Sequence, residues 1–368
     1  MDINFSKPTL EILKYHDIFK NTQNVEPLLQ YVIENNMLSY YNKMCAENEI
    51  SEKKEIRKKI EENIKKQIEE IQSDQSKELS ENDLLQNDIA LSAYYASILD
   101  YQNFEKSITS ILERNPSPSL RMDTVLCKIR MYLILNKKKS LYDAINAGKD
   151  IIEHGCDWDR RNKFKSYYAL YLVQKRDFTN ASDLFYDSLP TFDSPEIMDY
   201  NSFVVMFIFC GLLSFTRDEV KLKIVDNGNV NETRMANEEA LELVECFITC
   251  DYHNILLKIY SFCKKHIKSS VFLHELCNKF IYMFIARIFK QLLESYKSLN
   301  IGAIAQIFDV SDKFVEDYMF KFIVEKNIEA RIDGITKNVF VIDNEVNKDI
   351  FLAEKGDTLM RNITKNIK

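Results

Sequence analysis

Apolar residues recur every three or four positions along most of this chain, which is the spacing of one face of an α-helix. From residue 84 to about residue 190, helices of ordinary length are predicted to follow one another, with small alanines opposite large aromatic side chains. The longest apolar run, Phe203 to Phe215, predicts a buried helix, because a membrane span needs roughly 18–20 residues. The pattern predicts a mostly α-helical fold, a right-handed superhelix of stacked helical hairpins.

After residue 300 the pattern changes to that of a small mixed module. Two short helices are predicted, residues 301–308 and 311–326. Asn300 and Ser311 are expected to be their N-caps, because these side chains can accept hydrogen bonds from the free N–H groups of a first turn. A helix, a turn and a second helix followed by a hairpin predict a winged helix over residues 281–343.

The hairpin is predicted where the apolar period drops to two, with Asp333-Gly334 in the turn region between its strands. We expect its edge strand to extend the sheet of a neighbouring protein. The interaction residues predicted on this hairpin are Ile332, Val339 and Val341.

Two further segments complete the predicted organisation. Residues 50–72 form a charged helix with isoleucines at every fourth position, which favours a solvated helix packed by one edge, with a self-associating coiled coil as the alternative. Residues 344–368 predict a C-terminal amphipathic helix. The apolar stripe of this helix is Leu352, Leu359, Ile363 and Ile367.

These patterns divide the chain into four predicted regions. An N-terminal helical region covers residues 1–83, and helical repeats cover residues 84–199. Residues 200–343 form a third region, helical over 200–280 and winged-helical over 281–343. The C-terminal helix of residues 344–368 is the fourth.

Composition supports helices and argues against nucleic acid as a partner. The 368 residues include only 7 glycines and 6 prolines, too few for a fold that is rich in sheet turns. The formal net charge is −7, and the helix that would enter a DNA groove, residues 311–326, carries four acidic and three basic residues. A phosphate backbone would be repelled by such a surface. Neither a nucleic-acid nor a membrane partner is therefore expected.

The 8 cysteines lie scattered in apolar helical surroundings. The first residues carry no pattern of a secretory signal, so reduced thiols in the cytoplasm and nucleus are expected. Cys246, Cys250 and His253 are spaced to share one helix face, and thiolate and imidazole are ligands that zinc prefers. Because their spacing is not that of a closed zinc finger, buried thiols are the favoured interpretation and metal binding is the alternative.

The chain contains no motif that predicts catalysis. Gly148-Lys149 lacks the preceding glycine and the spacing of a phosphate-binding loop, and no metalloprotease, hydrolase or kinase signature occurs. We therefore expect no enzymatic activity and no cofactor.

Trp158 is the only tryptophan, and it begins a predicted helix together with Arg160 and Arg161. The favoured interpretation is structural: the indole packs against the preceding hairpin, and the arginines bind the backbone or carboxylates of the next repeat. The alternative is an interaction hot spot, since tryptophan and arginine dominate such sites.

Three strings in the chain resemble a known family, and they occur in the same order as in that family. They are GCDWDRRNKFK at residues 155–165, TFDSPEIMDY at residues 191–200 and QLLESYKSL at residues 291–299, which contains Tyr296. Helical hairpins similar to tetratricopeptide repeats, followed by a winged helix and a C-terminal helix, resemble the PCI-domain family. The strings are similar to its proteasome-lid branch, regulatory particle non-ATPase subunit seven.

The resemblance implies that residues 200–343 are a PCI domain and that the chain is a non-catalytic scaffold in the lid of the 26S proteasome regulatory particle. It implies contacts with other PCI-type lid subunits, with the deubiquitinase-containing lid module and with the ATPase ring. Structural roles are expected for Trp158, Arg160, Arg161 and Tyr296. Two alternatives remain: a scaffold similar to the first signalosome subunit, and a metal- or RNA-binding regulator built on a winged helix.

Overall fold

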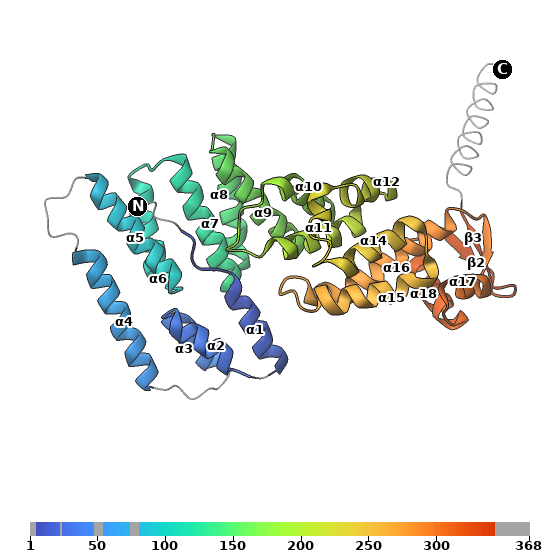
Figure 1. Ribbon diagram of the computed structural model, residues 1–368, viewed down its shortest axis with the longest axis horizontal. Coiled ribbons are helices and arrows are strands. Elements are labelled where there is room, and N and C mark those ends of the chain that lie inside the picture. Colours follow the sequence, from blue (N-terminus) through green and yellow to red (C-terminus); the bar gives the residue numbers. More distant parts are fainter. Residues whose placement is uncertain (1–4, 23, 48–53, 74–80, 343–368) are drawn as a thin grey trace, which may run out of the picture. The chain divides into compact units, whose positions relative to one another are not determined.

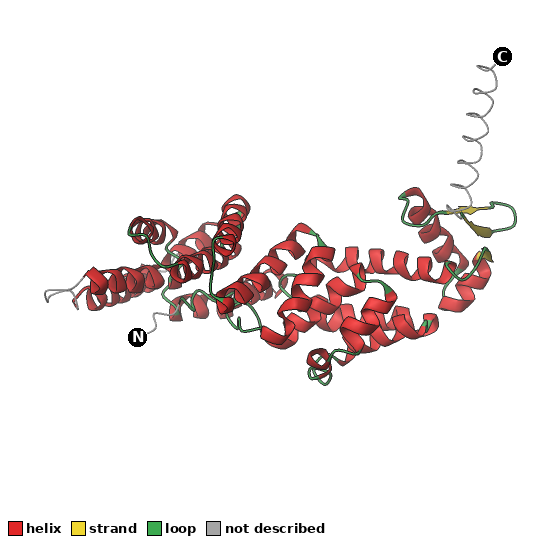
Figure 2. Cartoon of the chain, turned by 90° about the horizontal axis from the view of Figure 1, so that it is seen from above, coloured by secondary structure: helices red, strands yellow, loops and turns green. Residues whose placement is uncertain are grey.

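The computed structural model describes residues 5–22, 24–47, 54–73 and 81–342 of the chain. These residues form two compact units. The first unit contains the described residues of Met1–Phe215 together with Asp226–Asn237 and Lys268–His274. The second unit contains Thr216–Val225, Glu238–Ile267 and the described residues of Glu275–Lys368. The mostly helical fold is confirmed, and strands are confined to the C-terminal part of the described chain (Figure 2).

The first unit is built from helices that pack in sequential pairs (Figure 1). Three closely packed pairs, α5–α6, α7–α8 and α9–α10, form its repeat region. The helices are α1 (Glu11–Thr22), α2 (Glu26–Glu34), α3 (Leu38–Glu47), α4 (Lys54–Ser73), α5 (Glu81–Ser97), α6 (Tyr101–Glu113), α7 (Pro118–Ile134), α8 (Lys138–Glu153), α9 (Trp158–Lys175), α10 (Phe178–Ser188), the 3-10 helix η1 (Leu189–Thr191), α11 (Tyr200–Ser214) and α13 (Gly228–Asn231).

A short motif that the apolar pattern does not predict recurs at the turns of three helical hairpins, two of them in the first unit. The strings DYQN, DFTN and DYHN begin at Asp100, Asp177 and Asp251. In each, the aspartate caps the second helix, and its carboxylate accepts the backbone N–H and the side-chain amide of the asparagine three positions later. The residue before each aspartate has a positive φ, which turns the chain between the two helices. The motif therefore fixes the hairpin geometry locally.

Helix α11 contains the long apolar run, and it is buried as predicted. It packs on α10, so its contacts place it in the first unit. The division between the compact units therefore does not follow the predicted boundary at residue 199. Within the described residues, no helix combines the length and apolarity that crossing a membrane requires.

The charged helix of the N-terminal region is α4, and it packs against α3 and α5 by one edge. Ile60 is only 1% exposed, whereas Ile56, Ile64 and Ile68 are half-buried. The side-chain amide of Asn63 also donates a 3.3 Å hydrogen bond to the Oδ1 atom of Asn36. The predicted edge packing is thus confirmed.

The second unit consists of a helical part and a winged helix. Its elements are α12 (Arg217–Val220), the π-helix η2 (Lys221–Val225), α14 (Glu238–Thr249), α15 (Tyr252–Phe262), the π-helix η3 (Cys263–Ile267), α16 (Cys277–Leu293), β1 (Ser298–Asn300), α17 (Ile301–Phe308), α18 (Asp312–Val324), β2 (Ala330–Ile332) and β3 (Asn338–Val341). The 3-10 helix η4 (His274–Leu276) contains the position in the sequence, Glu275, at which the second unit resumes. The three strands form one antiparallel sheet in the order β1-β3-β2.

Candidate interaction surfaces

The described residues contain no group of three or more histidine, cysteine and acidic side chains that could hold a metal ion. The predicted sharing of one helix face by Cys246, Cys250 and His253 is wrong. Helix α14 ends at Thr249, Cys250 has a φ of 58° in the turn, and His253 lies in α15. Because the turn separates them, the three side chains do not line one helix face.

The environments of these cysteines favour packing over metal binding. Burial raises the pKa of the Cys246 thiol, with a further increase from Asp251, so the protonated form is favoured. The Sγ atom of Cys250 accepts a 3.2 Å hydrogen bond from the Nε2 atom of Gln291, which also donates to the carbonyl oxygen of Phe247 at 3.1 Å. Zinc would need thiolates, which this setting does not stabilise.

The winged helix is held on α16 by aromatic side chains. The ring of Phe289 lies 4.8 Å from that of Phe308 and 6.0 Å from that of Phe322, which joins α16 to both α17 and α18. The predicted N-caps are confirmed: Asn300 accepts from the N–H of Gly302, and Ser311 accepts from the N–H of Phe314. These caps fix where each helix begins.

The wing differs from the predicted hairpin because β1 adds a third strand. Strand β1 pairs with β3, and Leu299 lies opposite Val339. Strand β3 is therefore central, and its backbone groups bond to a neighbour on each side. The edges of the sheet belong to β1 and β2.

This order changes the assignment of the predicted interaction residues. Val339 is fully buried and Val341 lies in the central strand, so neither can supply an edge for pairing. Their prediction as edge residues is wrong, because the sequence pattern did not reveal β1. Ile332 is half-buried on β2, so it alone of the three lies on an edge strand.

Several large apolar side chains of the winged helix point into solvent. Phe320 and Val324 lie one turn apart on α18 and are 64% and 63% exposed. Ile335 in the wing turn and Phe340 on β3 are also exposed. Exposed apolar side chains gathered on one small module are typical of a protein-binding surface.

The start of α9 is tied to α7 by hydrogen-bonded ion pairs. The Arg160 guanidinium donates to both carboxylate oxygens of Asp123 on α7, at 2.9 and 2.8 Å, and to Asp157 at 2.9 Å. Ser119 also donates to Asp157. The prediction that Arg160 binds the next repeat is wrong, because the carboxylate that it binds belongs to Asp123 in the preceding hairpin.

Trp158, two residues before Arg160 in the sequence, is 67% exposed. Trp158 is the first residue of α9, and its high exposure argues against the predicted packing of the indole against the preceding hairpin. Arg161 is exposed as well, and its side chain makes no hydrogen bond or ion pair with any residue in the described ranges. Tyr296 is 44% exposed in the segment after α16. This pattern favours the interaction alternative for Trp158.

Comparison with known proteins shows what the chain is similar to. A family model described as 26S proteasome subunit RPN7 matches residues 51–223, and a PCI-domain model matches residues 251–342. The 26S proteasome non-ATPase regulatory subunit 6 of Caenorhabditis elegans is 27% identical over 360 residues, covering 93% of this chain and 86% of that protein. The chain is thus similar to RPN7 subunits of the 26S proteasome, and its residues 251–342 are similar to PCI domains.

Two further relatives differ in how much of the chain they match. The 26S proteasome regulatory subunit RPN7 of Saccharomyces cerevisiae is 29% identical over 330 residues, covering 88% of this chain and 74% of that protein. The COP9 signalosome complex subunit 1 of Arabidopsis thaliana is 25% identical over 131 residues, covering only 36% of this chain. The RPN7 similarity therefore extends over far more of the chain than the signalosome similarity.

A buried polar network that the apolar pattern does not predict joins residues of the RPN7-matched region to the N-terminal segment. Arg130 on α7 is 2% exposed and donates to the hydroxyl of Tyr167 on α9, to the backbone carbonyl of Phe5 and, at 3.5 Å, to Glu196. Tyr167 in turn donates to Glu196 at 2.8 Å. The available signal was an arginine within the apolar stripe of α7, beside Ile129 and Leu133.

This network ties the N-terminal segment to the repeat region. Burial alone would lower the pKa of the Arg130 guanidinium, but Tyr167, Cys127 and Glu196 outweigh it and raise that pKa. Arg130 is therefore charged. The backbone N–H of Leu10 donates a 2.9 Å hydrogen bond to the carbonyl oxygen of Glu196, which anchors the same segment a second time.

Replacing Trp158 with alanine is expected to change the free energy of unfolding by less than about 0.5 kcal/mol, because the indole is mostly exposed. Phe164→Ala in the same helix is the matched control, with an expected loss of about 3–5 kcal/mol, because Phe164 is buried. Urea unfolding followed by circular dichroism measures both. A loss above about 1.5 kcal/mol in Trp158→Ala would restore the packing role.

Proposed function

We propose that this chain is a non-catalytic scaffold subunit of the lid of the 26S proteasome regulatory particle, where it supports ATP- and ubiquitin-dependent protein degradation. The similarity to RPN7 subunits supports the assignment to the regulatory particle. The observation that carries the scaffold role is the winged helix, a small module with an open sheet edge and exposed apolar side chains. Peptidase, ATPase or deubiquitinase turnover by the purified chain would contradict the proposal.

The contact that we propose is strand addition at β2. The N–H of Asp333 donates to the carbonyl of Asn338, and the N–H of Ile342 donates to the carbonyl of Glu329. In this register Arg331 faces Phe340 as the hydrogen-bonded pair between them. The backbone groups of Ala330 and Ile332 are then directed away from β3. They are available to a strand of another PCI-type lid subunit.

Replacing Ile332 with proline is expected to lower co-purification with PCI-type lid subunits about tenfold, because it removes an outward N–H donor from the edge strand. The matched control is Ile332→Val, which keeps the donor and a β-branched side chain. Both variants are compared after co-expression with tagged lid subunits, and circular dichroism checks their helix content. Equal recovery of the two variants would exclude pairing at β2.

A second proposed contact involves residues 344–368, which lie outside the residues that the structure describes. The predicted stripe of Leu352, Leu359, Ile363 and Ile367 would enter a helical bundle formed with neighbouring lid subunits. Deleting residues 350–368 is expected to leave the helical array folded and to block lid assembly. Native gel electrophoresis of reconstituted lid measures this, and normal incorporation of the shortened chain would refute the bundle.

We further propose that the N-terminal helices reach the ATPase ring or the deubiquitinase-containing lid module, and that the protein resides in the cytoplasm and nucleus. The signalosome alternative is supported only by the shorter match to a signalosome subunit. Affinity purification from cells decides between them: proteasome lid subunits as the main partners support the proposal, and a signalosome complex contradicts it.

A further inference from the structure

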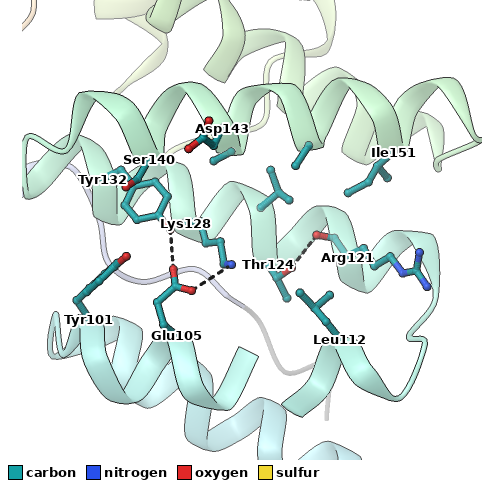
Figure 3. A pocket seen from close by; sticks show the side chains of 13 residues that line it. Tyr101, Glu105, Leu112, Arg121, Thr124, Lys128, Tyr132, Ser140, Asp143 and Ile151 are labelled. Carbon is teal, nitrogen blue, oxygen red and sulfur yellow. Dashed lines mark hydrogen bonds and ion pairs between the residues drawn. The ribbon is translucent and has the colours of Figure 1, made fainter. Parts of the chain in front are cut away.

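A groove with a volume of about 370 Å³ lies along α7 in the first unit. Helix α7 forms its floor, and α6 and α8 form its two walls (Figure 3). The floor runs from Arg121 to Tyr132, which corresponds to about 16 Å of helix. The groove is therefore about as long as three turns of an α-helix.

The two ends of the groove differ in chemistry. Leu112, Val125 and Ile151 make the end near Arg121 mostly apolar, and Tyr101 and Tyr132 lie at the other end (Figure 3). Glu105 lies near the tyrosines, but its oxygens are occupied: Tyr132 donates to one at 2.6 Å, and Lys128 lies 3.5 Å from the other. Residues of the groove itself therefore already bind the carboxylate of Glu105.

Two opposite charges along the groove are not neutralised. Arg121 donates only to uncharged oxygens, the backbone carbonyl of Pro116 and the side chain of Asn115. Asp143 on α8 is exposed and has no hydrogen bond or ion pair with any residue that the structure describes. Ile151, eight residues after Asp143 on the same helix, lies at the Arg121 end (Figure 3). The two charges are therefore separated by about 12 Å along the groove.

We propose that this groove binds an amphipathic helix of another protein, about three turns long. The ligand helix carries an acidic residue in its first turn, facing Arg121, and a basic residue two turns later, facing Asp143. Apolar residues between them contact Leu112, Ala147 and Ile151. An acid in the first turn also suits the helix macrodipole, which sets the direction of the ligand parallel to α7. This site lies in the repeat region and is additional to the proposed winged-helix contacts.

A helix fits this groove better than an extended peptide does. The apolar end offers few hydrogen-bonding groups, so the backbone N–H and C=O groups of an extended chain would lose water there without gaining partners. A helix satisfies those groups internally and presents only side chains to the groove. The charge spacing corresponds to seven or eight helical residues, which lie on one helix face.

The test uses the full chain and a fluorescein-labelled designed peptide of about fourteen residues with the stated pattern: glutamate in the first turn, leucines one turn later and lysine two turns later. Fluorescence anisotropy is expected to show saturable binding. Asp143→Lys should weaken it about tenfold, and a peptide with glutamate in place of its lysine should recover the affinity. Ala147→Arg should abolish binding by filling the groove. Glu62→Lys on α4, the same charge change outside the groove, should leave binding unchanged.

Three results would overturn the proposal. The first is no saturable binding of the designed peptide to the full chain. The second is binding that Asp143→Lys and Ala147→Arg leave intact. The third is equal affinity for a peptide with the glutamate and lysine exchanged, because the two charges of the groove would then not determine the direction in which the peptide binds.

Discussion

Replacing Arg130 with alanine is expected to lower the free energy of unfolding of the first unit by about 3–5 kcal/mol. Arg130 is 2% exposed, and its guanidinium donates hydrogen bonds to Tyr167, Glu196 and the carbonyl of Phe5. Alanine would leave a carboxylate and a carbonyl without their charged donor in a buried setting. Leaving a buried polar or charged group without a partner costs more free energy than the modest net contribution of the hydrogen bond itself.

The same substitution is expected to release the N-terminal segment. Phe5 and Leu10 are buried, and the carbonyl of Phe5 is a direct partner of Arg130. Limited digestion with a lysine-specific protease should cleave after Lys14 faster in Arg130→Ala than in the unchanged chain, because cleavage needs local opening. Urea unfolding by circular dichroism measures the stability loss in the same samples.

Two matched variants distinguish the network from a general effect of removing an arginine. Arg114→Ala removes a half-exposed ion pair with Asp88 and should cost at most about 1 kcal/mol. Arg130→Met combined with Glu196→Gln removes both charges and should be less damaging than Arg130→Ala, because no unpaired charge remains. If Arg130→Ala is as stable as Arg114→Ala, the network does not stabilise the unit.

The helices could be predicted from the sequence because their period is set by local geometry. The stripes of α17 and α18 and the caps Asn300 and Ser311 are encoded within a few residues of each other, and all are confirmed. The third strand could not be predicted in this way. Ser298–Asn300 is only three residues long and is followed directly by α17, and its strand character arises from pairing with β3 about 40 residues later.

Side-chain environment was less predictable than secondary structure. The indole of Trp158 was expected in a core because tryptophan is large and apolar, but a helix start places it outside. Arg130 shows the opposite case, a charged residue that is buried within an apolar stripe. It is accommodated there because it donates hydrogen bonds to Tyr167, Glu196 and Phe5, which are distant in the sequence. Both outcomes depend on neighbours that a periodic pattern does not identify.

The proposed interaction surfaces have the same dependence on distant residues. Only the sheet order shows that β2 and not β3 is exposed for pairing, since the apolar alternation is similar in both strands. The groove along α7 requires three helices, and its two free charges come from different helices. Periodicity located the helices that carry these surfaces, and tertiary packing determined which of their residues remain available.

Gly148 in the middle of α8 is the site of the second large expected effect. A Cβ atom at this position would lie 2.2 Å from the Cε2 atom of Phe164, a ring that is buried on α9. Alanine normally stabilises a helix by about 1 kcal/mol relative to glycine. Here the overlap should outweigh that gain, and Gly148→Ala is expected to lower the free energy of unfolding by about 3 kcal/mol.

The companion variants identify the cause of that loss. Gly228→Ala is the matched control, because an added Cβ meets nothing within 4 Å there, and its effect should stay within about 0.5 kcal/mol. Phe164→Leu should rescue Gly148→Ala, with a coupling energy of at least about 1 kcal/mol in the double-mutant cycle. Additive effects of the two substitutions in urea unfolding would show that the ring does not determine the need for glycine. Coupling would instead establish that α8 and α9 approach so closely that this position accepts no side chain.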